Sequence, residues 1–361
     1  MVIPLRGGLS TLALGPVVAA FFARTGIARI ARRWRPSDAC VLTFHGVRDG
    51  SDDDQLLDLD QHVHIALFKQ VCAHLAANYT VLPLAEIVKA RASGRSLPAQ
   101  TVAITFDDGY ASNHDLAFPV LKEHGLPATI FATAGYLDGR ISLWFHRIEM
   151  AFARTQMVHL DTVIHGETLK FPLGSREERI TALGAVTAQL KKLPTTDMLE
   201  GLAAIESTLG MSPAMGPQLP PALRPMSWDQ AREMQAGGLI EFGGHTDTHP
   251  ILARCTEAQQ AEEIRASRER LADELGVQPQ TFAYTNGKVG DFTATTQRLL
   301  KEEGFTAAFT MLESFLLPGD DPLMLPRYGC PSSCDFLEAV VSGSMARFLS
   351  LRKILGLVRA A

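Results

Sequence analysis

Short apolar runs alternate with segments of helical periodicity along most of the chain. The runs Val41–Phe44, Val102–Phe106 and Ala128–Thr133 have the length of buried strands and are flanked by loop-forming residues. In Ile65–Asn78 and Ala258–Leu275, by contrast, apolar residues recur at helical spacing. Such strand-helix alternation predicts a parallel α/β architecture, in which helices cover the sheet. Further strands are predicted at Thr80–Leu82 and Leu239–Phe242, and further helices at Leu84–Arg91, Asp115–Glu123, Arg176–Lys191 and Asp197–Thr208.

Composition agrees with one large globular domain. The chain has 361 residues, of which 46% are hydrophobic and 20% charged, enough to bury a substantial core. A net charge of −5, without basic residues interleaved with aromatic ones in the core, argues against a nucleic-acid partner. The five cysteines are scattered and odd in number, which is not the pattern of a disulfide framework.

The two ends of the chain are basic, although the chain as a whole is acidic. Residues 1–35 contain six arginines and no acidic residue, and the basic, apolar pattern of Phe336–Val358 predicts an amphipathic C-terminal helix. Residues 7–23 are uncharged but short for a membrane span, and they include Gly15 and Pro16. If they did span a membrane, the arginines that follow would keep the domain in the cytoplasm. We therefore predict a cytoplasmic protein, which is membrane-associated if its ends rest on an anionic membrane; the alternative is that the ends dock on the main domain.

Two adjacent carboxylates, Asp107 and Asp108, end the strand Val102–Phe106, and Gly109 follows as a turn residue. Carboxylates so close repel each other unless a cation or a proton neutralises part of the charge. A bound divalent metal would do so and would leave one acid free to act as a base. The alternative is an ordinary Asp-Asp-Gly turn at a strand end.

Two histidines follow the strand Leu239–Phe242. Gly243 and Gly244 break that strand in our interpretation, and a helical turn would then bring His245 and His249 onto one face. Together with one Asp they form a three-ligand site with open positions, as expected of a hydrolytic metal centre. Both clusters follow strands, at the edge where α/β barrels place their active sites.

These motifs resemble those of the polysaccharide deacetylases, over roughly residues 39–330, and the resemblance implies a catalytic domain of residues 39–335. The segment Thr105–Gly109 is similar to the first family motif, and His245–His249 to the second. The resemblance implies a distorted, incompletely closed parallel (β/α) barrel. It also implies Asp107 as the base and Asp108, His245 and His249 as ligands of a divalent metal. Zn²⁺ suits these ligands best, and Co²⁺, Ni²⁺ or Mn²⁺ would also fit.

Three further site residues are expected from looser matches. Phe282–Gly287 resembles the third motif, with Thr285 in place of a proline, and the backbone N–H of Asn286 is the candidate oxyanion donor. No arginine precedes this segment as in other members, so Arg327 is the candidate brace for Asp107, or else a surface residue. His45 ends the strand Val41–Phe44, which comes first in circularly shifted members. The resemblance gives His45 the role of the acid.

The stretch of about residues 137–226 is longer than the corresponding segment in compact members of the family. We predict an inserted helical subdomain, one that could form a wall of the substrate cleft. Trp144 could stack on a sugar ring or belong to the core, and His146 and His165 receive no role.

The resemblance implies a metal-dependent hydrolase that removes N-acetyl groups from an N-acetylhexosamine poly- or oligosaccharide or a lipid-linked glycan. An O-acetyl esterase, or a hydrolase of non-sugar amides, would use the same centre. A third possibility is a glycan-binding barrel without turnover, suggested by the missing arginine and the missing late histidine motif.

Overall fold

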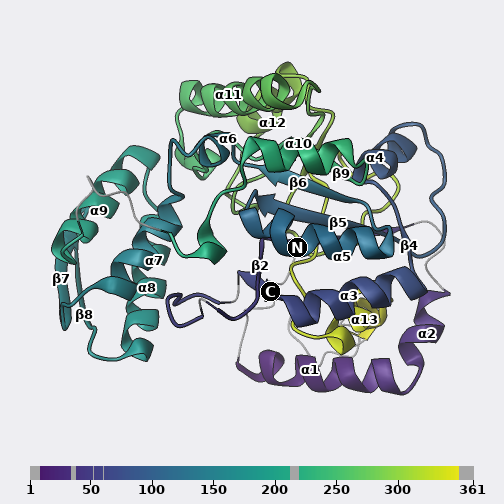
Figure 1. The fold of residues 1–361 in the computed structure, drawn as a ribbon, viewed down its shortest axis with the longest axis horizontal. Helices are drawn as coiled ribbons and strands as arrows, with labels where there is room; N and C mark the ends of the chain where they lie inside the picture. Colours follow the sequence, from purple (N-terminus) through teal and green to yellow (C-terminus); the bar gives the residue numbers. More distant parts are fainter. Residues whose placement is uncertain (1–8, 34–37, 52, 60, 212–218, 349–361) are drawn as a thin grey trace.

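A parallel sheet forms the centre of the computed structural model, which describes residues 9–33, 38–51, 53–59, 61–211 and 219–348 (Figure 1). Its strands follow the order β1-β5-β6-β9-β10-β11, and β4 also pairs with β5. The strands are β1 (Ala39–Phe44), β4 (Thr80–Val81), β5 (Thr101–Asp108), β6 (Ala128–Ala132), β9 (Ile240–Gly244), β10 (Thr281–Ala283) and β11 (Ala307–Phe309). The predicted parallel α/β class is therefore confirmed.

The sheet curls until its first and last strands are joined by a short extended segment. Leu325 forms a parallel bridge with Phe309 of β11, and Tyr328 forms one with Leu42 of β1. The Tyr328 N–H donates to the carbonyl of Val41 at 2.8 Å, which fixes this seam. Since isolated bridges rather than a regular strand complete the ring, the barrel is incompletely closed, as predicted. Arg327 lies within this seam.

Helices cover the outside of the sheet (Figure 1). They are α3 (Ile65–Asn78), α4 (Leu84–Ala92), α5 (Phe118–His124), α10 (Trp228–Ala236), α11 (Glu257–Leu275) and α12 (Ala294–Glu302). Phe68 of α3 and Leu121 of α5, both fully buried, belong to the same core cluster as Ile104 of β5. The helix predicted at Asp115–Glu123 is divided, because a π-helical turn, η1 (Asn113–Ala117), precedes α5.

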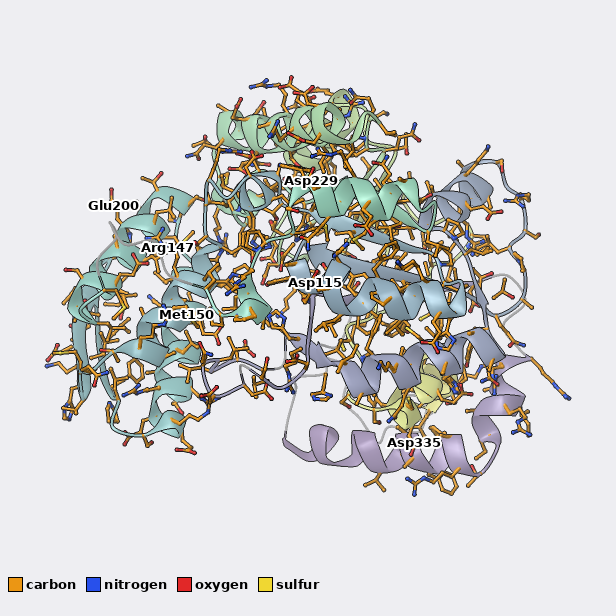
Figure 2. All side chains as sticks on the ribbon, in the orientation of Figure 1. Asp115, Arg147, Met150, Glu200, Asp229 and Asp335 are labelled. Carbon is orange, nitrogen blue, oxygen red and sulfur yellow. The ribbon has the colours of Figure 1, made fainter. Side chains whose placement is uncertain are left out.

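The segment after β6 forms a unit beside the sheet with a core of its own, which includes Ile148, Phe152 and Val186 (Figure 1). Its elements are α7 (Trp144–Arg154), β7 (His159–Ile164), β8 (Glu167–Pro172), α8 (Arg176–Leu190) and α9 (Thr195–Thr208). The antiparallel hairpin β7–β8 was not predicted, and His165 lies in its tight turn with a φ of 48°. Figure 2 shows Arg147 and Met150 on α7 and Glu200 on α9.

Two contacts tie this insertion together and to the barrel. Arg147 of α7 donates to both carboxylate oxygens of Glu206 on α9, at 2.8 and 2.6 Å. Glu149, on the same helix, accepts through Oε1 from the N–H groups of Leu57 and Asp58 at 2.7 and 2.8 Å. The loop that follows β2 (Gly46–Arg48) and leads to β3 (His62–His64) is thereby fixed to the insertion.

The terminal helices pack on one another and on α3. They are α1 (Leu9–Arg24), α2 (Ile27–Arg32) and α13 (Cys334–Val341). Ala19 and Phe22 of α1 share a core cluster with Ala339 of α13. The predicted C-terminal helix is interrupted, since α13 ends at Val341 and residues 344–348 are again helical; residues 349–358 lie outside the described residues. Among the described helices, none is long and apolar enough to cross a bilayer.

Candidate metal centre

Three predicted metal ligands converge at the carboxyl ends of β5 and β9. Asp108, His245 and His249 each offer one ligand atom, and these atoms all lie within 4.8 Å of one another. Oδ1 of Asp108 is 3.4 Å from Nε2 of His245 and 3.2 Å from Nε2 of His249. Asp108 and His245 are buried, whereas the side chain of His249 is 12% exposed. The sequence therefore identified side chains that the fold brings together.

The hydrogen bonding of these side chains fits a divalent cation. Neither carboxylate oxygen of Asp108 has a hydrogen-bond partner among the described residues, although both are buried. A buried carboxylate without partners is costly, so this arrangement calls for a positive ligand. Nδ1 of His245 donates to the carbonyl of Ala283 at 2.8 Å, which orients the ring so that Nε2 faces Asp108. Such an outer hydrogen bond is typical of a histidine that binds metal.

The local electrostatics keep Asp108 ionised. Burial alone would raise the pKa of Asp108, but His245 and His249 outweigh it and hold the pKa well below its usual value. An ionised carboxylate with two imidazole nitrogens is a donor set suited to Zn²⁺ and similar divalent ions.

Backbone conformation, rather than a helical turn, aims these ligands. The predicted turn at 245–249 is wrong, because the segment has no helical structure. Six described non-glycine residues have a positive φ, and four of them lie in the site motifs: Asp108 (72°), Thr246 (66°), His249 (64°) and Asn286 (61°). Residues held in this sparsely populated region cluster at functional sites, where the surrounding structure maintains them.

The glycine pair before His245 serves close packing. Gly243 and Gly244 belong to β9 and do not break it, contrary to the prediction. A Cβ atom on Gly243 would lie 2.6 Å from the ring of Phe131 and 2.8 Å from the carbonyl of Thr281. The absence of side chains at these positions thus lets β9 pack closely against β6 and β10, which fixes the position of His245 directly after the strand.

A glutamate from α11 holds the histidine loop in place. Oε2 of Glu263 accepts from the N–H groups of Asp247 and Thr248 at 2.9 and 2.8 Å. Within the loop, Oγ1 of Thr246 accepts from the N–H of His249 at 2.9 Å. Sequence reasoning missed Glu263, because its helix reads as a solvated one.

Asp107 lies beside the ligands and is held by Arg327. The Arg327 guanidinium donates from Nη1 and Nη2 to the two carboxylate oxygens of Asp107, at 2.7 and 2.9 Å. Both side chains are almost entirely buried. Burial raises the pKa of Asp107, but the positive charge of Arg327 outweighs it and lowers the pKa below the usual value. Arg327 is therefore a buried partner of the candidate base and not a surface residue.

His45 and Asn286 are the other two residues predicted for the site. His45 follows Phe44, which pairs with Phe106 of β5, so His45 lies beside the strand end that carries Asp107; its carbonyl accepts from Nδ2 of Asn113 at 2.7 Å. The side chain of Asn286 accepts from Nζ of Lys191 at 2.8 Å and donates to Asp291 at 2.5 Å. These bonds orient the turn after β10, and the role of the Asn286 N–H stays a prediction.

The insertion contributes one side of the site. Phe145 of α7 meets the ring of His249 edge-on, with centroids 5.1 Å apart. His146 is buried, and its Nε2 lies 2.8 Å from the hydroxyl of Tyr110. Burial lowers the pKa of His146 to about 3, so that its ring is neutral. Trp144 is buried in the insertion's own core, so the core alternative holds for this residue.

A curled parallel barrel whose strand ends carry an Asp-His-His cluster and an adjacent buried carboxylate has the residues that suit a hydrolytic metal centre. The chain belongs to the polysaccharide deacetylase family, whose sequence profile matches residues 94–308.

The relatives share parts of this chain. The poly-β-1,6-N-acetyl-D-glucosamine N-deacetylase of Escherichia coli strain K12 is 28% identical over 106 residues, which span 29% of this chain and 15% of that protein. The putative polysaccharide deacetylase YxkH of Bacillus subtilis strain 168 is 63% identical over 30 residues, 8% of this chain and 11% of that protein. The matches thus span only a small part of these proteins' lengths.

Solved structures share the fold more widely. The Streptococcus pyogenes deacetylase PplD, in complex with acetate, has a TM-score of 0.56 and 17% identity, over 85% of this chain and 99% of that one. The structure of IcaB from Ammonifex degensii has a TM-score of 0.52 and 20% identity, over 85% and 98%.

Proposed function

We propose that this chain is a metal-dependent hydrolase that removes N-acetyl groups from an N-acetylhexosamine-containing poly- or oligosaccharide or lipid-linked glycan. The observation that carries the proposal is the pairing of Asp107 with Arg327 directly beside the Asp108, His245 and His249 cluster. This arrangement separates a carboxylate that can accept a proton from one that can bind a cation. Family membership and the similarity to a poly-N-acetylglucosamine deacetylase support the choice of substrate class.

Hydrolysis of an acetamide has three requirements. A water must lose a proton, the acyl oxygen must carry negative charge, and the departing amine must gain a proton. Asp108, His245 and His249 would hold the cation, which when bound lowers the pKa of water towards about 7 and polarises the acyl oxygen.

The remaining residues handle the protons and the substrate. Asp107 takes the proton of the attacking water, and Arg327 keeps both carboxylate oxygens in a fixed orientation. His45 gives a proton to the nitrogen as the carbon–nitrogen bond breaks, so that the products are acetate and a free amine. The Asn286 N–H donates to the developing oxyanion in this proposal.

Asp107→Asn tests the proposal, because asparagine keeps the shape of the side chain and cannot take up the proton. We expect the wild type to release acetate from N-acetylglucosamine oligomers and to leave free amines, and Asp107→Asn to be slower by about 100-fold or more. The matched control is Asp161→Asn, on the exposed hairpin of the insertion. Binding of the oligomers should persist in both variants.

Other outcomes would favour the alternatives. Release of acetate only from O-acetylated sugars, or turnover of a non-sugar amide alone, would assign the same residues to a different acyl substrate. Glycan binding without release of acetate in the metal-loaded wild type would refute hydrolysis and leave a binding protein.

A further inference from the structure

The two N-terminal helices expose a concentration of large apolar side chains. Val17, Phe21, Ile27 and Ile30 are 65, 55, 38 and 61% exposed, respectively. They lie within 14 residues on α1 and α2. Isolated exposed apolar residues are ordinary, but a contiguous group of them marks an interaction surface.

The opposite side of the same helices is already occupied. Ala19, Phe22 and Ala28 share a core cluster with Ala339 of α13, and the rings of Phe22 and Phe348 lie with their centroids 5.5 Å apart. Figure 1 shows α1 and α2 as an outer layer, with α13 between α1 and α3. The exposed apolar side chains therefore do not belong to the face that folds onto the rest of the molecule.

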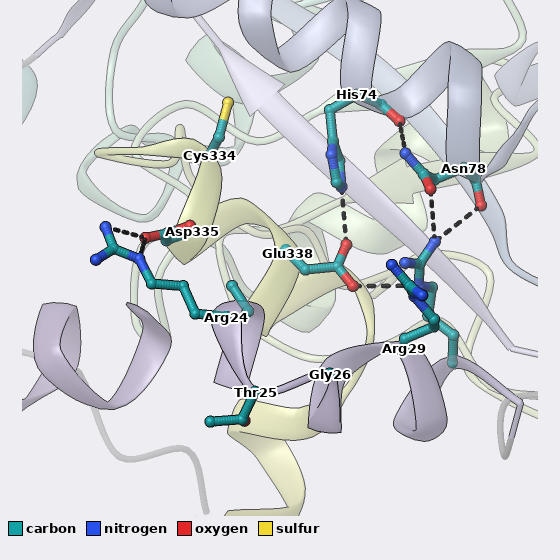
Figure 3. A pocket seen from close by; sticks show the side chains of 11 residues that line it. Arg24, Thr25, Gly26, Arg29, His74, Asn78, Cys334, Asp335 and Glu338 are labelled. Carbon is teal, nitrogen blue, oxygen red and sulfur yellow. Dashed lines mark hydrogen bonds and ion pairs between the residues drawn. The ribbon is translucent and has the colours of Figure 1, made fainter. Parts of the chain in front are cut away.

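Salt bridges fix the two helices in this orientation. Arg24, at the end of α1, pairs with Asp335 at 3.2 Å, and Arg32 of α2 pairs with Glu338 at 3.1 Å. Nε2 of His74 lies 2.8 Å from the same Glu338, and these side chains border a cavity of about 540 Å³ (Figure 3). Since α13 and α3 hold both helices, the outer surface is preformed.

The outer surface is also basic. Arg29 and Arg33 are exposed, and no acidic partner contacts either of them among the residues that the structure describes. Arg29 reaches the rim of the cavity in Figure 3. The whole of residues 1–35 contains no acidic residue, so nothing on this segment would repel an anionic partner.

We propose that the α1–α2 surface (Val17, Phe21, Ile27, Arg29, Ile30 and Arg33) docks on an anionic membrane. Helices that lie in a membrane interface combine apolar side chains, which enter the headgroup region, with arginines, which bind lipid phosphates. Exposed arginines and exposed apolar residues lie on the same two helices, and residues 1–35 contain no acidic residue, so the charge pattern favours an anionic lipid surface over a protein partner. This inference is independent of the proposed hydrolysis.

The test is flotation of the full-length chain with vesicles of phosphatidylcholine alone or mixed with phosphatidylglycerol, at about 0.1 M salt. We expect binding to the anionic vesicles and little to the neutral ones. Arg29→Glu should weaken partitioning roughly fivefold or more, from the usual contribution of one basic residue near an anionic surface. Phe21→Asp should weaken it by about tenfold, because a charged residue replaces an inserted ring.

Two controls match these variants. Val163→Asp changes a residue of similar exposure (59%) on the insertion hairpin, and Lys301→Glu reverses a charge on the outside of α12. Both should bind vesicles like the wild type. Circular dichroism of all four variants identifies any that fail to fold, and Arg29→Glu, at an exposed position, tests the proposal independently of Phe21→Asp.

Three outcomes would overturn the proposal. One is the absence of binding to anionic vesicles, and another is an equal loss of binding in variants and controls. The third is self-association of the chain in light scattering that Phe21→Asp abolishes, since the surface would then be an interface between protein copies.

Discussion

Replacing Arg327 by methionine removes the one positive charge in direct contact with the candidate base, among the described residues. Arg327 has no solvent exposure and forms two bonds to Asp107. Its Nε donates to the carbonyl of Thr310 at 3.3 Å, and its guanidinium lies 5.3 Å from the ring centre of Phe131. Methionine fills a similar volume but leaves Asp107 buried without its partner.

The expected cost follows from that unpaired charge. Removing one member of a buried ion pair typically destabilises a protein by about 3–5 kcal/mol. In an Asp107→Asn background, Arg327 is itself a buried charge without an ionic partner, so replacing it by methionine should cost about 1 kcal/mol or less. The two substitutions should therefore be coupled by about 3 kcal/mol.

Urea unfolding of the wild type, the two single variants and the double variant measures this coupling. A chelator must be present throughout, because metal binding to the folded state would add to the apparent stability. An equal cost of Arg327→Met in both backgrounds would refute the reasoning, since it would mean that Arg327 does not stabilise the ionised carboxylate of Asp107.

Two further predictions concern stability. Burial raises the pKa of Glu149 to about 7, above the value of 4.5 for an exposed glutamate, so its contribution to stability is full below about pH 4.5 and falls as the pH rises through 7. Glu149→Gln should therefore stabilise the chain by about 2–3 kcal/mol more at pH 8 than at pH 5 in urea unfolding, and a pH-independent effect would contradict this. Gly243→Ala should destabilise by about 1–3 kcal/mol, because its Cβ would clash with Phe131. Its control is Gly184→Ala on α8, where nothing lies within 4 Å of the new Cβ and a gain of about 0.5–1 kcal/mol in the thermal unfolding free energy is expected. Equal effects of the two glycine substitutions would contradict the packing argument.

Local patterns in the sequence predicted most elements and the residues of the cluster. Asp107, Asp108 and His245 lie at or directly after strand ends. Because parallel strands end at the same edge of a sheet, these residues were expected to lie close together. The helix Ile65–Asn78 has the predicted bounds, since its apolar spacing is regular.

What the sequence did not show depends on contacts between distant segments. Glu263 reads as one more charged residue on a solvated helix, and only the packing of α11 against the histidine loop gives it a partner. The sequence left Arg327 as either the partner of Asp107 or a surface residue, and the seam between β1 and β11, which no local pattern marks, decides for the partner. The positive φ of Thr246 was equally hidden, because a β-branched residue rarely adopts it.

Metal content per chain tests the central claim most directly. The purified wild type, His249→Ala and His165→Ala would be incubated with Zn²⁺, desalted and measured by mass spectrometry; His165 is the control because it lies in the hairpin turn of the insertion. We expect about one metal ion per chain in the wild type and in His165→Ala. His249→Ala should retain much less metal, because its affinity for the metal should fall by about 10-fold or more. No retained metal in the wild type, or equal retention in His249→Ala, would contradict a metal centre formed by Asp108, His245 and His249.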